Sequence, residues 1–84
     1  MDDNKWHVYL LECNDGSYYT GVTNNIEKRM RAHKTGKGSK YVVSRGFKII
    51  LASRECNSKS DACKAEYAIK QLLKKDKLMW FEMS

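Results

Sequence analysis

The chain has 84 residues, of which 42% are hydrophobic and 31% charged. This length predicts a single domain over residues 1–84 with a thin core, because so short a chain buries only about 60% of its unfolded surface. No apolar run approaches the roughly 20 residues of a membrane span. The first five residues do not resemble a signal peptide. Three cysteines without CxxC spacing and only two histidines do not form a zinc pattern, so we expect a reduced, cytoplasmic protein.

The charge is basic and unevenly distributed. Sixteen basic and ten acidic residues give a net charge of +6. Residues 28–54 contain nine basic residues and no acid, whereas residues 1–27 contain five acids and one lysine. An acid-free basic stretch within a folded domain is typical of a polyanion partner. On charge alone, a solvated basic face is an equally good interpretation.

The first half of the chain predicts a hairpin followed by a helix. Residues 6–13 are apolar on both faces until Glu12, which indicates a central strand. Residues 14–17 predict a turn, and a second strand follows at 18–23. Asn24 or Asn25 can cap a helix over 26–34. Ile26, Met30 and His33 share one face of that helix.

The second half predicts a basic loop, a strand and a longer helix. Residues 35–46 carry three glycines among lysines, and residues 47–53 form the third strand. Ser58-x-x-Asp61 resembles a capping signature that opens a helix over 59–75. The apolar stripe of this helix is Ala62, Ala65, Ile69, Leu72 and Leu73. The tail at 78–81 is hydrophobic enough to pack back as a short helix or turn. The fold class is therefore α+β: a small three-stranded antiparallel sheet flanked by helices, in the order ββαβα plus a C-terminal short helix.

The turn at 14–16 determines whether two tyrosines share a face. A two-residue loop would place Tyr9 and Tyr19 on opposite faces of the sheet. A three-residue loop with Gly16 in the left-handed conformation pairs Tyr9 with Gly21 and brings both tyrosines to one face. We favour the three-residue loop. The alternative role for either tyrosine is an ordinary half-buried strand residue.

These segments resemble the GIY-YIG endonuclease superfamily, in particular its short stand-alone bacterial members. Val8-Tyr9-Leu10 and Tyr19-Thr20-Gly21 match the two signature segments, with Val8 in place of a glycine. Residues 24–33, 36–41 and 64–70 match the following blocks, so the similarity covers about 6–73. Many members carry a lysine where this chain has Val22, and an asparagine after the glutamate helix that has no counterpart here.

The resemblance assigns Tyr9, Tyr19, Arg29 and His33 to catalysis. Arg29 and His33 lie at i and i+4 of one helix, so both can meet a single phosphate. An arginine fork suits phosphate and offsets charge in the transition state. The alternatives are a solvated charge for Arg29 and a packed, hydrogen-bonded side chain for His33.

The resemblance also assigns Glu66 to one divalent ion, Mg²⁺ or Mn²⁺. Glu66 lies on or beside the apolar stripe of the second helix, where an unpaired carboxylate is costly. Mg²⁺ often takes one carboxylate together with water and phosphate oxygens. The alternative is an ion pair with Lys70 at i+4.

The implied activity is metal-assisted hydrolysis of a phosphodiester in DNA, in repair, recombination or nucleic-acid turnover. Tyr9 would act as general base with help from His33, and Tyr19 would orient the water or phosphate. Five further residues are expected to bind nucleic acid: Lys34, Lys37, Lys40, Tyr41 and Arg45. Because we expect a single domain without a second one to select a target, sequence preference should be weak or should come from a partner protein or from DNA shape. Two alternatives remain: a non-catalytic nucleic-acid-binding module with the nuclease fold, and a domain whose basic surface meets an acidic protein.

Overall fold

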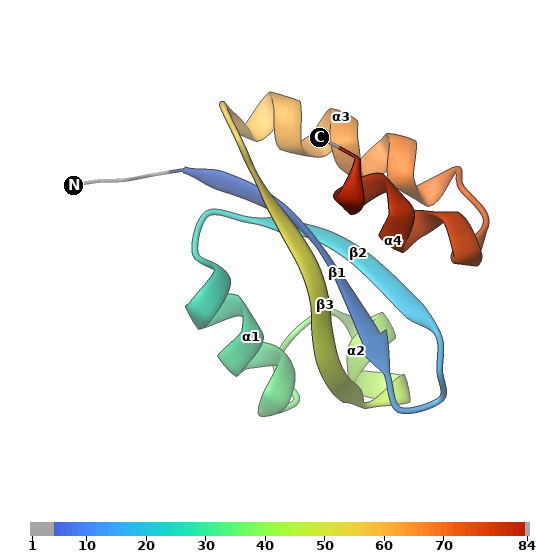
Figure 1. Ribbon diagram of the computed structural model, residues 1–84. Helices are drawn as coiled ribbons and strands as arrows, with labels where there is room; N and C mark the ends of the chain where they lie inside the picture. The colour runs from blue at the N-terminus through green and yellow to red at the C-terminus, as the bar shows by residue number, and fades with distance from the viewer. Residues whose placement is uncertain (1–4, 84) are drawn as a thin grey trace.

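The computed structural model describes residues 5–83. The ends of the predicted domain, at 1–4 and 84, lie outside the described residues, as does most of the segment in which we expect no signal peptide. Three strands form one antiparallel sheet in the order β2-β1-β3. They are β1 (Trp6–Cys13), β2 (Tyr18–Thr23) and β3 (Phe47–Cys56). The apolar strand β1 lies in the middle, which confirms the prediction of a central strand (Figure 1).

Helices cover both faces of the sheet. The helices α1 (Ile26–Lys34) and α2 (Lys40–Arg45) lie on one side, and α3 (Lys59–Lys70) and α4 (Lys74–Glu82) lie on the other (Figure 1). The α+β class and the three-stranded antiparallel sheet flanked by helices are therefore confirmed. The short helix α2 lies within the predicted loop, and Ser39 caps it by accepting from the Val42 N–H.

The predicted hairpin register is confirmed. Gly16 has φ +87°, and its N–H donates to the Cys13 carbonyl at 2.9 Å. The three-residue turn pairs Tyr9 with Gly21 and Leu11 with Tyr19. Gly16 is needed here because a side chain strains the backbone at this φ. Tyr9 and Tyr19 therefore lie on the same face of the sheet.

The two faces of β1 build two thin cores. Tyr9, Leu11 and Cys13 are buried with Met30 of α1 and Val42 of α2. On alternate positions Val8 and Leu10 are fully buried, as are Ala62 and Ile69 of α3. Burial of a large apolar side chain contributes about 1.5–3 kcal/mol, so these few residues carry much of the stability.

The predicted single helix over 59–75 is wrong. The first helix ends at its C-cap Gln71, and Leu73 is the N-cap of α4. Leu73 is 65% exposed and does not belong to the packed stripe. The break allows α4 to fold back, where the Lys77 ammonium donates to the Ile69 carbonyl at 2.9 Å. The predicted packing of the tail as a short helix is confirmed.

The third strand is longer than predicted, because its pairing with β1 continues to Cys56 opposite Trp6. The Arg54 guanidinium on this extension lies 4.2 Å from the Trp80 ring centroid and donates to the Trp80 carbonyl at 3.2 Å. It therefore fastens α4 to the sheet.

Across residues 5–83, none of the helices combines the length and apolar character of a membrane span. Cys13, Cys56 and Cys63 are unpaired thiols.

Candidate active site

The hydroxyl of Tyr9 is the centre of a buried polar cluster. It lies 2.9 Å from His33 Nε2 and 3.4 Å from Arg29 Nε. Arg29 can only donate, so the Tyr9 oxygen accepts from it. The phenolic proton is then free to point at His33 Nε2, which accepts it if the ring is neutral and carries its hydrogen on Nδ1.

Two residues of the edge strand β2, Tyr19 and Gly21, lie next to this hydroxyl. The Tyr19 ring centroid lies 6.3 Å from that of Tyr9 and 5.9 Å from that of His33. A Cβ atom added to Gly21 would lie 2.5 Å from the Tyr9 hydroxyl oxygen and 3.0 Å from Tyr19 Cε2. The absence of a side chain at Gly21 thus allows the Tyr9 ring to lie across β2.

The His33 side chain is buried and tightly packed. It is 3% exposed, and its ring stacks on Phe47 with centroids 6.1 Å apart. Gly38 packs so closely against the Nδ1 edge that a Cβ atom there would overlap the ring. Nδ1 has no hydrogen-bond partner among residues 5–83. His33 is therefore packed, and its hydrogen bond is to Tyr9.

Burial and charge shift the titration of all three groups. Burial raises the pKa of Tyr9, and the hydrogen bond from Arg29 opposes that shift. Burial lowers the pKa of His33 below 6.5, and the nearby Arg29 charge lowers it further. The hydrogen bond to Tyr9 raises the pKa of Arg29. At neutral pH the cluster therefore contains a protonated tyrosine, a neutral imidazole and a guanidinium.

Glu66 comes from α3, which lies on the opposite side of the sheet (Figure 1). Its negative charge acts in the direction that raises the pKa of Tyr9, as a smaller cause than burial. The side chain is 23% exposed and forms an ion pair with Lys70 at 3.2 Å. The predicted i, i+4 alternative is therefore present in the structure.

The donor set fits one weakly held divalent ion. Within residues 5–83, His, Cys, Asp and Glu side chains do not gather in groups of three or more. A multi-ligand protein cage is thus absent from the described chain. A single partly exposed carboxylate, as Glu66 provides, is sufficient for Mg²⁺ that keeps several waters and binds phosphate oxygens.

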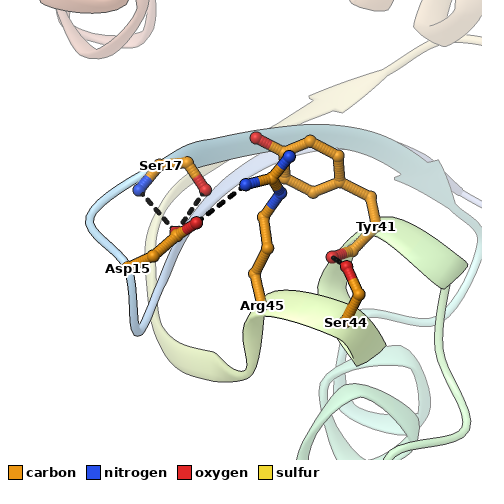
Figure 2. A network of polar contacts seen from close by, with 5 residues as sticks. All are labelled: Asp15, Ser17, Tyr41, Ser44 and Arg45. Atoms are coloured by element: carbon orange, nitrogen blue, oxygen red, sulfur yellow. Dashed lines mark hydrogen bonds and ion pairs between the residues drawn. The ribbon is translucent and has the colours of Figure 1, made fainter.

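The predicted nucleic-acid residues divide into two groups. Lys34, Lys37 and Lys40 are exposed around the loop that closes on His33. Tyr41 and Arg45 instead belong to an ordered network with the hairpin turn (Figure 2).

In this network Tyr41 lies between the candidate site and Arg45. Its ring centroid is 5.6 Å from that of Tyr19, and the Arg45 guanidinium lies 4.4 Å from it. Arg45 also pairs with Asp15 at 2.8 Å, and Asp15 accepts from the Ser17 N–H and hydroxyl (Figure 2). The Ser17 and Arg45 hydrogen bonds hold the pKa of the Asp15 carboxyl well below its usual range. The charge of Arg45 is therefore largely matched within the protein.

Sequence reasoning missed three contributors to these clusters. Asp15 carried a signal, because an aspartate two residues before a serine commonly closes an Asx turn. Gly38 and Phe47 carried none, since their contacts with His33 depend on how the loop and β3 pack.

A tyrosine pair, an arginine and a histidine thus meet on one face of a three-stranded α+β domain. The chain belongs to the GIY-YIG catalytic domain family, whose model matches residues 5–79. This confirms the resemblance seen in the sequence.

The chain is similar to other small proteins along most of its length. It is 46% identical to UPF0213 protein OB0043 of Oceanobacillus iheyensis over 95% of this chain and 93% of that protein. The solution NMR structure of UPF0213 protein BH0048 from Bacillus halodurans is 38% identical, with a TM-score of 0.57 over 95% of this chain and 85% of that one. The solution NMR structure of EF2693 from E. faecalis is 32% identical, with a TM-score of 0.66 over 96% of this chain and 86% of that one.

Proposed function

We propose that this chain is a metal-dependent endonuclease that hydrolyses phosphodiester bonds in DNA, in repair, recombination or nucleic-acid turnover. The observation that carries the proposal is the buried Tyr9 hydroxyl, 2.9 Å from His33 Nε2 and 3.4 Å from Arg29 Nε. This oxygen contacts both an imidazole nitrogen that can accept a proton and a guanidinium that can offset negative charge.

The cluster supports a proton relay. A free Tyr9 phenolate is disfavoured, because burial raises the pKa of this group above 10.0. The hydroxyl can still take a proton from an attacking water if it passes its own proton to His33 Nε2 at the same time. Arg29 then offsets the negative charge that develops on the phenolic oxygen and on the phosphate.

The remaining residues position the substrate. Tyr19 borders the hydroxyl and orients the water or phosphate, while Lys34, Lys37 and Lys40 bind the flanking backbone. Glu66 would hold one Mg²⁺ or Mn²⁺, which supplies positive charge to the scissile phosphate. The Val22 and asparagine departures remove two polar groups common in relatives, and the exposed lysines after α1 replace the first.

Glu66→Gln tests the proposal. The change keeps the size of the side chain and removes the charge that would hold the metal. Supercoiled plasmid, single-stranded DNA and RNA are each incubated with Mg²⁺, Mn²⁺ or chelator. The wild type should nick DNA only with metal, and Glu66→Gln should lose cleavage while it binds DNA and melts no lower. Glu82→Gln, on an exposed residue of α4, is the matched control.

The alternative function is a non-catalytic nucleic-acid-binding module, and the Glu66–Lys70 ion pair at 3.2 Å favours it. In that case Glu66 neutralises a lysine and needs no metal. Salt-dependent DNA binding by a wild type that cuts no substrate with any metal would establish this alternative. A Glu66→Gln variant that cuts as well as the wild type would refute the metal assignment.

A further inference from the structure

The turn between α3 and α4 brings a second group of lysines to the edge of the sheet. Lys70 is the last residue of α3, and Lys74, Lys75 and Lys77 lie in the first four residues of α4. Lys70, Lys74 and Lys75 are exposed. All of them lie outside the acid-free stretch at 28–54, and the proposed reaction has not used them.

Lys74 has a defined position beside the edge strand. Its ammonium lies 4.7 Å from the ring centroid of Tyr18, the first residue of β2. The next residue, Tyr19, contacts Tyr41 of α2 at 5.6 Å between centroids. Successive strand residues point to opposite faces, so these two tyrosines meet basic elements on the two sides of the sheet.

β2 is therefore flanked on both faces by positive charge. One face has the loop and α2, with Lys37 and Lys40, and the other has the α3–α4 turn. Because β2 is an edge strand, no further strand lies outside it within residues 5–83. A linear polyanion crossing this edge would meet both groups of lysines.

The positive charges of the lysines at this turn are electrostatically unfavourable. Burial lowers the pKa of Lys77, and the neighbouring Lys70 charge lowers it further. Cations at the start of a helix also oppose the helix macrodipole. Only Lys70 of this group forms an ion pair with an acid among the described residues, and that acid is Glu66. An anion bound at the turn would offset both costs.

We propose that Lys74 and Lys75, together with Lys70, form a second phosphate-binding surface, so that the nucleic acid crosses the edge of β2 and is held on both faces of the sheet. This inference rests on the proposed function and specifies the path of its substrate. The Lys70–Glu66 contact places this surface next to the proposed metal ligand, on the side of the site opposite to Lys37 and Lys40.

Salt-dependent binding tests the path. Affinity for a labelled DNA oligonucleotide is measured by fluorescence anisotropy over a range of salt, without metal so that no cleavage occurs. Each lysine that neutralises a phosphate contributes about 0.9 to the slope of log affinity against log salt for duplex DNA and about 0.7 for single strands. Lys74→Gln should reduce the slope by about one such step, and Lys74→Gln with Lys75→Gln by about two.

Lys59→Gln is the matched control. Lys59 also lies over an aromatic ring, 5.4 Å from the Trp6 centroid, but at the opposite end of α3. Its loss removes the same charge and should leave the slope unchanged. Thermal melting checks the fold of each variant, and Lys75→Gln alone tests the surface if the loss of Lys74 unfolds the chain.

Two outcomes separate this inference from the proposed function. If the double variant keeps the wild-type slope while Lys37→Gln with Lys40→Gln reduces it, the second surface is refuted and nucleic-acid binding stands. If the wild type binds with no salt dependence, both the second surface and the nucleic-acid function are refuted.

Discussion

A tyrosine, an arginine and a third polar side chain meet twice on the α1 and α2 side of the sheet. The inner cluster is Tyr9, Arg29 and His33, with Tyr9 fully buried and His33 3% exposed. The outer cluster is Tyr41, Arg45 and Asp15, and the arginine and aspartate side chains are 43% and 42% exposed. The Tyr19 ring lies between them and contacts Tyr9 on one side and Tyr41 on the other.

The difference in burial gives the two clusters different properties. In the inner cluster, desolvation is the largest cause of the shifts in the pKa values of Tyr9 and His33. In the outer cluster, hydrogen bonds to charged groups dominate, and solvent screens them. Burial therefore controls the protonation states of the inner cluster, whereas we expect the exposed outer cluster to exchange its internal ion pair for a phosphate.

The largest effect is expected from Tyr9→Phe in the inner cluster. The change removes the hydroxyl of the proposed relay, and general acid–base catalysis typically contributes about 10²–10⁴-fold to a rate. Single-turnover cleavage should fall within that range. The free energy of unfolding should fall by about 1–3 kcal/mol, because the buried His33 Nε2 and Arg29 Nε both lose their hydrogen-bond partner.

Tyr67→Phe is the control for this change. Tyr67 follows Glu66 on α3 and is 70% exposed, so the loss of its hydroxyl should alter neither rate nor stability. A Tyr9→Phe variant that cleaves at the wild-type rate would show that the buried cluster is structural.

A smaller effect is expected from pH, again through the inner cluster. The pKa of His33 is lower in the folded protein than the ordinary 6.5, so the unfolded chain binds more protons between the two values. The stability contributed by neutral His33 is therefore present above pH 6.5 and is lost as the pH falls through the folded value. Cleavage should follow the same titration, since a protonated imidazole cannot accept from Tyr9.

Cleavage rates and melting temperatures from pH 5 to 8 check this expectation. The acid limb of the rate should have its midpoint below 6.5, and His33→Gln should abolish the corresponding fall of the melting temperature at low pH. A midpoint above 6.5 would mean that a different group, or a stabilised imidazolium, controls the reaction.

The family resemblance selected the residues of the inner cluster, and two parts of its geometry follow from local sequence. Gly16 fixes the hairpin register that pairs Tyr9 with Gly21, and helical spacing places Arg29 and His33 on one face. Both depend on short-range turn and helix rules. The strand and helix bounds at 6–13, 18–23 and 26–34 are confirmed for the same reason.

Features that depend on packing between distant segments were not predictable. The break after Lys70 has no glycine or proline to signal it, and it arises because α4 packs back on the sheet, where Arg54 holds it. The basic stretch at 28–54 was interpreted as typical of a polyanion partner. Its last residue, Arg54, instead contacts Trp80 of α4. The position of Glu66 relative to Tyr9 likewise depends on how α3 packs across the sheet.

The smallest effect is expected from Asp15→Asn in the outer cluster. Asparagine keeps an oxygen that can accept from the Ser17 N–H, so the turn should persist and the melting temperature should change little. The substitution removes the charge that pairs with Arg45 at 2.8 Å. Arg45 then becomes available to a phosphate, and the slope of log affinity against log salt should steepen by at most about 0.9.

Arg45→Gln and the double variant Asp15→Asn with Arg45→Gln complete a double-mutant cycle. The cycle isolates the contribution of the Asp15–Arg45 interaction to DNA binding. If Asp15 only restrains Arg45, the gain from Asp15→Asn should vanish in the Arg45→Gln background. Weaker DNA binding by Asp15→Asn alone would instead show that Asp15 orients the guanidinium on Tyr41 toward the substrate. In that case the outer cluster would be as preorganised as the inner one, and exposure would not distinguish their roles.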